Sequence, residues 1–400
     1  MNSAANSISP NVFIIAGEAS GDALGANLMK VLIKKTGGKI NFHGVLGEKM
    51  LKAGSKAGAT SIFPMSDLSV MGLTEVLPKL PTIMGRIKQT VQEIVQTKPD
   101  VIVTIDAPDF CFRVAKKIKK LNPHIPIVHY VAPSVWAWRP GRAKKIAEFV
   151  DHLLCLLPFE PKYFSDVGLS ATFVGHPVIE SKIGGGDGED FRKRHSISEF
   201  APLLMVLPGS RAGEISRLLP VFGETVGLLK HTYPQMEAVV VTLSTTHDKV
   251  SSVVKNWPVK TTIVGEDEKS DAFAASDVAL AASGTVALEL AMAELPSVVA
   301  YKMAPLTAFL AKRLIKAKFA NIVNLVLDRP AIPELLLENC NPDKLAKEIS
   351  ELFNSQNARA NQRKAYSEAM ATLGLGTISP GNRSADVVLG LVETNNKGIQ

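Results

Sequence analysis

Short, wholly apolar runs alternate with stretches of helical spacing along both halves of this 400-residue chain. A strand that is apolar at every position is buried on both faces, which is typical of a parallel sheet covered by helices on either side. The pattern predicts an α/β protein of two doubly wound, Rossmann-like domains that face each other across a cleft. The expected strands are 12–16, 40–46, 101–105, 125–131, 152–157 and 171–174 in the first half, and 203–207, 238–243, 261–264, 278–282 and 297–301 in the second.

A glycine-rich run at 184–188 separates the two halves. Its composition is the most flexible in the chain, so we expect a linker there. The predicted domains are therefore 1–183 and 184–345, followed by C-terminal helices over 346–400.

Composition narrows the range of partners. The chain carries a net charge of +7, with basic runs at 116–120, 139–145 and 312–318, but only 6% of its residues are aromatic. With no recognisable nucleic-acid motif, these runs favour solvated faces or contact with anionic lipid over nucleic acid. Three widely spaced cysteines, Cys111, Cys155 and Cys340, indicate reduced thiols in a cytosolic protein. No apolar stretch is long enough for a membrane span, so we expect any membrane association to be peripheral.

Two strand-to-helix turns in the second half carry the features of a phosphate site. One strand runs into Pro208-Gly209-Ser210-Arg211, and another runs into Ser283-Gly284-Thr285. Such turns expose backbone N–H groups at the positive end of a helix dipole. Arg211 adds a cation, and Glu289 adds an acceptor for hydroxyl groups. Together they predict a pocket for a nucleoside diphosphate with a ribose, whereas the absence of G-x-G-x-x-G and Walker A sequences disfavours hydride transfer and P-loop chemistry.

Carboxylates follow two strands of the first half. Asp106 directly follows an apolar strand, where a side chain points toward the ligand edge of a parallel sheet and can act as a base. Asp109 fits a helix cap better. In the first turn, Glu18 is placed to hold a substrate hydroxyl or amide. Ser20 and Asp22 fit helix caps, and Ser20 is also a substrate-binding candidate.

Two apolar segments allow both a packing and a binding interpretation. Trp136 and Trp138 alternate along an extended stretch, where they form either core or one wall of a substrate site. Residues 65–86 are apolar but contain two prolines and two glycines, which argues against one regular helix. This segment is either core or an exposed flap for acyl chains or a bilayer surface.

Taken together, these tracts resemble the lipid-A-disaccharide synthase family, inverting glycosyltransferases of the two-domain GT-B type. The resemblance extends over about residues 12–340, and the tracts that end in Trp136-Ala137-Trp138 and in Asp109-Phe110 are its most specific parts. The matching stretches are 16–22, 70–72, 105–110, 129–138, 157–160, 174–177, 207–211, 282–285, 310–314 and 321–325.

The resemblance implies an enzyme of lipid A biosynthesis at the cytoplasmic face of a Gram-negative-type inner membrane. It would join UDP-2,3-diacylglucosamine to 2,3-diacylglucosamine 1-phosphate (lipid X), release UDP and form a β-1,6 disaccharide, with no cofactor and no metal. Homodimers, some with exchanged C-terminal segments, and last helices that cross back onto the first domain are further family features.

Site residues follow from the same resemblance. Asp106 would take the proton from the acceptor hydroxyl, with either Glu18 or Asp109 assisting, while Arg211 and the 283–285 turn neutralise the leaving diphosphate. Asn324, in the matching stretch 321–325, joins the substrate-binding candidates.

Two other functions fit parts of the pattern. A UDP-sugar 2-epimerase of the same architecture would share the nucleotide pocket but would need no lipid acceptor. A non-catalytic lipid-binding protein would have no nucleotide pocket.

Overall fold

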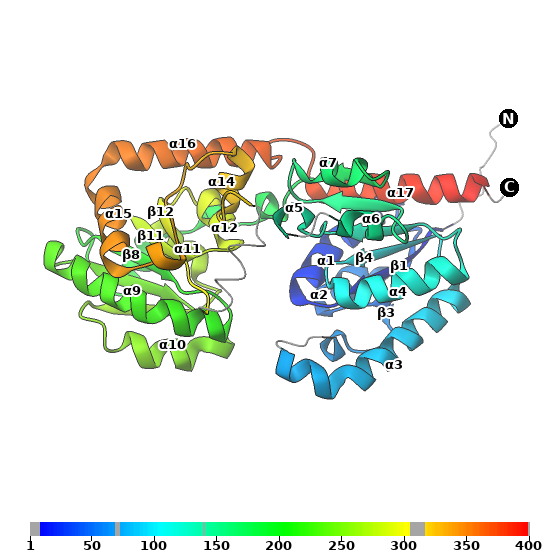
Figure 1. Ribbon diagram of the computed structural model, residues 1–400, viewed down its shortest axis with the longest axis horizontal. Helices are drawn as coiled ribbons and strands as arrows, with labels where there is room; N and C mark the ends of the chain where they lie inside the picture. Colours follow the sequence, from blue (N-terminus) through cyan, green and yellow to red (C-terminus); the bar gives the residue numbers. More distant parts are fainter. Residues whose placement is uncertain (1–8, 69–72, 139–140, 305–316, 399–400) are drawn as a thin grey trace. The chain divides into compact units, whose positions relative to one another are not determined.

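The computed structural model describes residues 9–68, 73–138, 141–304 and 317–398. The chain forms two compact units, one of Met1–Pro177 with Gly376–Gln400 and one of Val178–Leu375. The division falls at 177/178, a few residues before the expected boundary at 183/184. Figure 1 follows the chain through both units.

The first unit is built on a parallel sheet of seven strands. The strand order is β3-β2-β1-β4-β5-β6-β7, and β1 pairs with both β2 and β4 in parallel register. The apolar runs therefore predicted the sheet correctly, apart from the two-residue edge strand β3. The strands are β1 (Asn11–Ala16), β2 (Asn41–Val45), β3 (Thr60–Ser61), β4 (Val101–Ile105), β5 (Ile127–Tyr130), β6 (His152–Cys155) and β7 (Ser170–Phe173).

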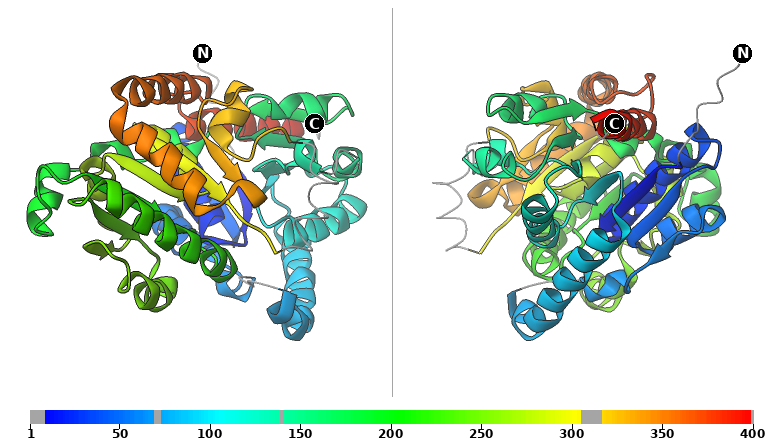
Figure 2. Two further views of the ribbon diagram at one scale, coloured as in Figure 1. Left: turned by 60° about the vertical axis from the view of Figure 1, so that its left-hand side comes forward. Right: turned by 90° about the vertical axis from the view of Figure 1, so that its right-hand side faces the viewer.

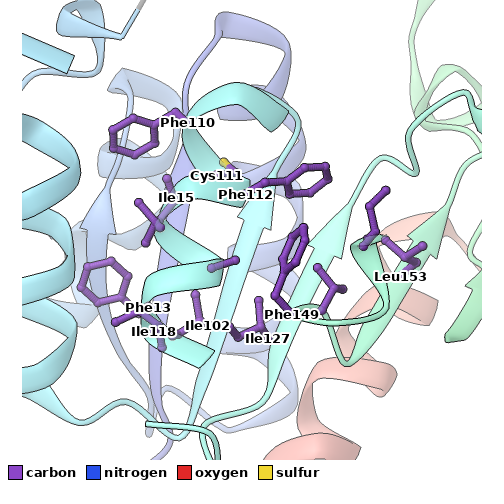
Figure 3. Packing of buried hydrophobic residues seen from close by; sticks show 14 of the residues in the cluster. Phe13, Ile15, Ile102, Phe110, Cys111, Phe112, Ile118, Ile127, Phe149 and Leu153 are labelled. Atoms are coloured by element: carbon purple, nitrogen blue, oxygen red, sulfur yellow. The ribbon is translucent and has the colours of Figure 1, made fainter. Parts of the chain in front are cut away.

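Helices cover both faces of this sheet (Figure 2). On one face, Phe110, Cys111 and Ile118 of the α4 helix are buried together with Phe13, Ile15 and Ile102 of the sheet (Figure 3). This buried layer holds α4 against β1 and β4. The helices are α1 (Ala19–Lys35), α2 (Glu48–Gly54), α3 (Leu73–Thr97), α4 (Pro108–Leu121), α5 (Val135–Trp138), α6 (Arg142–Ile146), α7 (Glu160–Ser165) and α17 (Pro380–Gly398).

The second unit repeats the plan with six parallel strands in the order β10-β9-β8-β11-β12-β13. The strands are β8 (Leu203–Leu207), β9 (Glu237–Val241), β10 (Thr261–Val264), β11 (Val278–Ala282), β12 (Ser297–Tyr301) and β13 (Glu334–Leu336). Its helices are α8 (Gly188–Arg194), α9 (Ala212–Thr232), α10 (His247–Val254), α11 (Lys269–Ala275), α12 (Val286–Met292), α14 (Ile322–Leu327), α15 (Pro342–Asn354) and α16 (Gln356–Thr372). The predicted α/β class with two doubly wound sheets is confirmed.

The C-terminal helices divide between the units. In the second unit, α16 is held by buried hydrogen bonds: the Ser297 N–H donates to Gln362 Oε1 at 2.8 Å, and the hydroxyls of Ser297 and Tyr366 lie 2.9 Å apart. In contrast, α17 belongs to the first unit, where Ala385 and Val388 are buried in the core with α1. The last helix thus completes the first unit.

The 65–86 segment is not one regular helix, as expected, because a separate 3-10 turn, Met65–Asp67, precedes α3. The two prolines, however, do not interrupt α3, which runs from Leu73 to Thr97 through both of them. Ile87, Val91 and Ile94 are buried in the core of the first unit, so packing of this later, proline-free part outweighs the local cost of proline. Residues 69–72 of this segment lie outside the described residues.

The glycine-rich run is packed rather than loose. A Cβ on Gly186 would lie 2.1 Å from the carbonyl oxygen of Ser270, and one on Gly188 would lie 2.5 Å from that of Ala274. Asp187 adds two bonds: its N–H donates to Asp271 Oδ1 at 2.9 Å, and its own side chain caps α8. These glycines are required by a close approach to α11, so the interpretation as a flexible linker is wrong.

This packing predicts a position-specific glycine effect. Gly186→Ala forces its methyl group into the α11 backbone and should lower the free energy of unfolding by about 1–3 kcal/mol. Gly185→Ala is the matched control, because a Cβ added there would meet nothing within 4 Å, and it should stay within about 0.5 kcal/mol of wild type. Urea denaturation of the three proteins measures both. Equal midpoints would mean that the run does not contact α11.

Candidate functional site

A cavity of about 450 Å³ lies at the carboxyl edge of the second sheet. It is formed where β8, β9 and β11 end, because parallel strands deliver their following loops to the same edge. Both predicted phosphate turns line it. The lining residues that carry polar or charged side chains are Ser210, Arg211, Glu214, Thr242, Glu266, Lys269, Ser283, Thr285 and Glu289.

The first turn differs from the prediction in one respect. Arg211 is the exposed N-cap residue of α9, as an anion-binding residue would need to be. The Glu214 carboxylate lies against this turn, since a Cβ on Gly209 would come within 2.1 Å of its Oε2 atom. Burial raises the pKa of Glu214, although nearby Arg211 and the backbone of the turn pull it the other way.

The second turn, Ser283–Thr285, is held by a hydrogen bond to the segment at Ala320. The Ser283 hydroxyl donates to the carbonyl oxygen of Ala320 at 3.1 Å, and Glu334 in turn accepts from the N–H groups of Ala320 and Asn321, both at 2.8 Å. The Ser283 hydroxyl thereby helps to position the turn, and Ser283, Gly284 and Thr285 all line the cavity.

Glu289 lies in the same cavity on α12, as predicted. Its Oε2 atom is 2.7 Å from the Lys269 ammonium group, and its side chain is 26% exposed. The sequence alone does not predict Lys269 as a site residue, because it belongs to a different helix and nothing in its neighbours marks it.

Asp106 lies at the carboxyl edge of the first sheet, just after β4. Its N–H donates to the carbonyl oxygen of Tyr130 at 3.0 Å, and its φ of 51° is left-handed. Ala107 is left-handed as well. Two such residues in succession hold Asp106 out of the strand and out of α4. Within the described part of the chain, no hydrogen bond or ion pair engages its carboxylate.

The β1 turn lies against the β4 turn, since a Cβ on Gly17 would come within 2.6 Å of Ala107 Cβ. Glu18, the exposed N-cap residue of α1, is thus brought to the same edge as Asp106. Ser20 is exposed in the first turn of α1.

Three predicted caps differ from expectation. Ser20 lies inside the first turn of α1, whose N-cap is Glu18. Asp22 is buried, and its carboxylate accepts from the N–H groups of Lys49 and Met50 at 2.9 and 3.0 Å. It therefore stabilises the start of α2 rather than its own helix. The N-cap of α4 is Ala107, without a side-chain bond, and Asp109 is exposed in the first turn.

Asn324 is placed away from solvent. It is fully buried, and its Oδ1 accepts from the N–H groups of Ala331 and Ile332 at 2.9 and 2.8 Å. Its amide nitrogen donates to the Ile332 carbonyl. Because these bonds engage both the oxygen and the nitrogen of the side chain, we assign Asn324 to loop structure rather than to substrate contact.

Trp136 and Trp138 have different environments. Trp138 is 42% exposed, whereas Trp136 packs edge-on against Phe159 and donates from Nε1 to Glu160 at 3.3 Å. Buried Glu160 also accepts from the N–H groups of Leu156 and Leu157 at 3.0 Å. Burial raises the pKa of Glu160 to about 7. Sequence reasoning missed this residue as the anchor of α5.

Solved structures with the same architecture define the class of the fold. Acinetobacter baumannii MurG has a TM-score of 0.57 at 12% identity, covering 95% of this chain and 99% of that one. Staphylococcus aureus MnaA, solved with UDP, has a TM-score of 0.63 at 14% identity, covering 96% and 97%. The fold is the GT-B glycosyltransferase type.

Sequence comparison is more specific. The family described as lipid-A-disaccharide synthetase matches residues 12–380. The Rhodospirillum centenum lipid-A-disaccharide synthase is 49% identical over 95% of this chain and 94% of its own, and that of Paramagnetospirillum magneticum is 48% identical over 95% and 97%. The chain belongs to the lipid-A-disaccharide synthase family. UDP-sugar 2-epimerases resemble it in fold alone, at 11% identity in the Neisseria meningitidis enzyme.

The environment of Glu160 predicts a pH-dependent stability. With a pKa near 7 when folded and near 4.5 when unfolded, the carboxyl binds more protons in the folded state between these values. The contribution of Glu160 to the free energy of unfolding is therefore full below about pH 4.5. It is lost as pH rises to 7, and the loss is about 3 kcal/mol at most. Glu160→Gln should remove this slope.

Urea unfolding of wild type and Glu160→Gln between pH 5 and 8 measures the difference. The comparison is needed because buried His129 and half-buried His176 have lowered pKa values and contribute the opposite slope. Parallel pH profiles for the two proteins would contradict the assignment.

Proposed function

We propose that this chain transfers a diacylglucosamine unit from UDP-2,3-diacylglucosamine to lipid X, releasing UDP and forming the β-1,6 disaccharide. The observation that supports the reaction best is the cavity in the second unit, where Arg211, the Ser283–Thr285 turn and Glu289 meet. A cation, exposed backbone and a carboxylate in one cavity fit the diphosphate and ribose of a UDP-sugar.

In the proposed donor site, Arg211 and the turn at Gly284 and Thr285 receive the negative charge that grows on the diphosphate as the glycosidic bond breaks. Glu289 accepts hydrogen bonds from the ribose hydroxyls. Ser283 acts through the turn that it holds against Ala320.

On the acceptor side, Asp106 is the proposed general base. Inversion requires one base that removes the proton from the attacking hydroxyl of lipid X. The carboxylate of Asp106 is held at the ligand edge of the sheet by left-handed backbone. Glu18 lies at the same edge and is the candidate to bind the acceptor's polar groups.

The direct test mixes both acylated substrates with the protein and follows UDP release and product mass. A chelator is present throughout, because the family resemblance implies a metal-independent reaction. A product with the mass of lipid X plus one diacylglucosamine, less one water, supports the proposal. UDP released without lipid X, or a donor that is merely epimerised, would contradict it.

Two variants should separate the roles within the site. Asp106→Asn should cut turnover by roughly two to four orders of magnitude and leave UDP affinity unchanged, because it removes the base alone. Arg211→Ala should weaken UDP binding by about 1–3 kcal/mol, since a charged partner of the diphosphate is lost. Calorimetric UDP titration and turnover measure both. Normal turnover of Asp106→Asn would remove it from the mechanism.

We also propose that the chain forms a homodimer as its family does.

A further proposal is that the first unit binds the inner-membrane surface from the cytoplasmic side. Among the helices that the structure describes, none is long and apolar enough to cross a membrane. Leu80 and Met84 of α3 are exposed apolar side chains, and Met84 lies 3.8 Å from Arg113 of α4. With exposed Lys116 and Lys117 on the same helix, apolar and basic groups adjoin, which suits anionic lipid.

Vesicle binding should therefore have two components. Rising salt screens the lysines and arginines but leaves apolar contact, so binding to anionic vesicles should weaken without vanishing. Replacing Leu80 and Met84 by serine should remove most of the binding that persists at high salt. Leu228→Ser, at an exposed position on α9, is the control. Co-sedimentation across a salt series measures this, and a double variant that sediments like wild type at high salt would refute the surface.

A further inference from the structure

Lys269 is the second cation of the donor cavity, and its side chain is only 13% exposed. It belongs to α11, whereas Arg211 belongs to the start of α9. Its ammonium group lies 2.7 Å from Glu289 Oε2 and 3.2 Å from Glu266 Oε1. The same group lies over the ring of buried Phe273, 6.0 Å from its centre. Three neighbours therefore fix the position of Lys269 before any ligand binds.

The two oxygens of Glu289 have different surroundings. Oε2 is buried, and its contact with Lys269 has the distance of an ion pair without the angles of a hydrogen bond. Since the Glu289 side chain is nevertheless 26% exposed, its exposure belongs to its other atoms. The carboxylate thus turns one oxygen to the lysine and leaves the rest facing the cavity.

The charges of the cavity make this contact necessary. The ionisable lining residues are three carboxylates, from Glu214, Glu266 and Glu289, against two cations, from Arg211 and Lys269. Glu214 lies against the turn at Gly209, beside Arg211. Without Lys269, Glu266 and Glu289 would both face an anionic nucleotide with no cation between them, and like charges repel at such range.

We propose that Lys269 is a positioning residue for ribose recognition: it holds Glu289 in the orientation in which the free oxygen accepts from the 2′- and 3′-hydroxyls of the donor nucleotide. This inference rests on the proposed UDP-sugar site. It deepens that proposal because it makes the preference for a ribose diol depend on a residue of α11 that does not itself contact the ribose.

The test compares UDP with 2′,3′-dideoxy-UDP, which keeps the base and the diphosphate but lacks the hydroxyls. In wild type, UDP should bind about tenfold more tightly than the analogue, the loss expected for hydrogen bonds to a charged group. Lys269→Met should raise the UDP dissociation constant about tenfold and change that of the analogue less than about threefold. Lys269→Arg should restore most of the preference for UDP.

Lys260→Met is the matched control, because Lys260 also pairs with a glutamate, Glu237, in the same unit but does not line the cavity. It should bind both nucleotides like wild type. The double variant Lys269→Met/Glu289→Ala leaves no unpaired charge of this pair, so it provides a folded protein even where the single change is poorly tolerated. In it, UDP and the analogue should bind equally.

Distinct results would overturn distinct claims. If Lys269→Met weakens both nucleotides equally, Lys269 acts as a general charge and the positioning role is wrong. The role is equally wrong if Lys269→Met changes neither affinity, or if the double variant still prefers UDP. A wild-type protein that binds neither nucleotide would instead refute the donor site itself, and the inference with it.

Discussion

The parallel pairing of β1 with β4 and of β8 with β11 fixes where the candidate site residues lie. The registers align the strand ends, with Ala16 opposite Ile105 and Ala281 opposite Leu207. Residues that follow such strands are delivered to one edge of the sheet. The pairing depends in turn on burial, since every residue of β4, β8 and β11 is buried. The positions of Asp106 and Arg211 thus follow from apolar residues that lie in the core.

The charged side chains of the donor cavity are held by their immediate neighbours. Glu214 lies against the turn at Gly209, beside Arg211, and Lys269 pairs with Glu289. A cavity with three carboxylates and two cations has no strong positive field to attract an anion. If the cavity binds a diphosphate as proposed, recognition has to come from fixed groups at defined positions, the kind of preorganised arrangement that stabilises charge without rearrangement.

The sequence predicts those features whose cause lies in neighbouring residues of the chain. The strands at 203–207 and 278–282 are predicted to the residue because both their faces are apolar, whereas β3 and β13 are too short to show a period. Glu214 does carry a local signal, since it lies three residues after the N-cap Arg211. Lys269, Glu160 and the packing of Gly186 depend on partners outside their own segments, and no local pattern marks them.

Backbone strain distinguishes the two sheet edges. At the first, Asp106, Ala107 and Val131 have φ of 51°, 42° and 78°, a left-handed conformation that costs an L-residue roughly 1–2 kcal/mol. The bonds from Asp106 N–H to Tyr130 and from Val131 N–H to Leu154 hold it there. Among the described residues that line the cavity of the second unit, only Gly209 is left-handed, and glycine adopts this conformation without strain. Strain of this kind gathers at functional sites. The strained backbone at Asp106 therefore supports the proposal that this carboxylate acts at the edge of the first sheet.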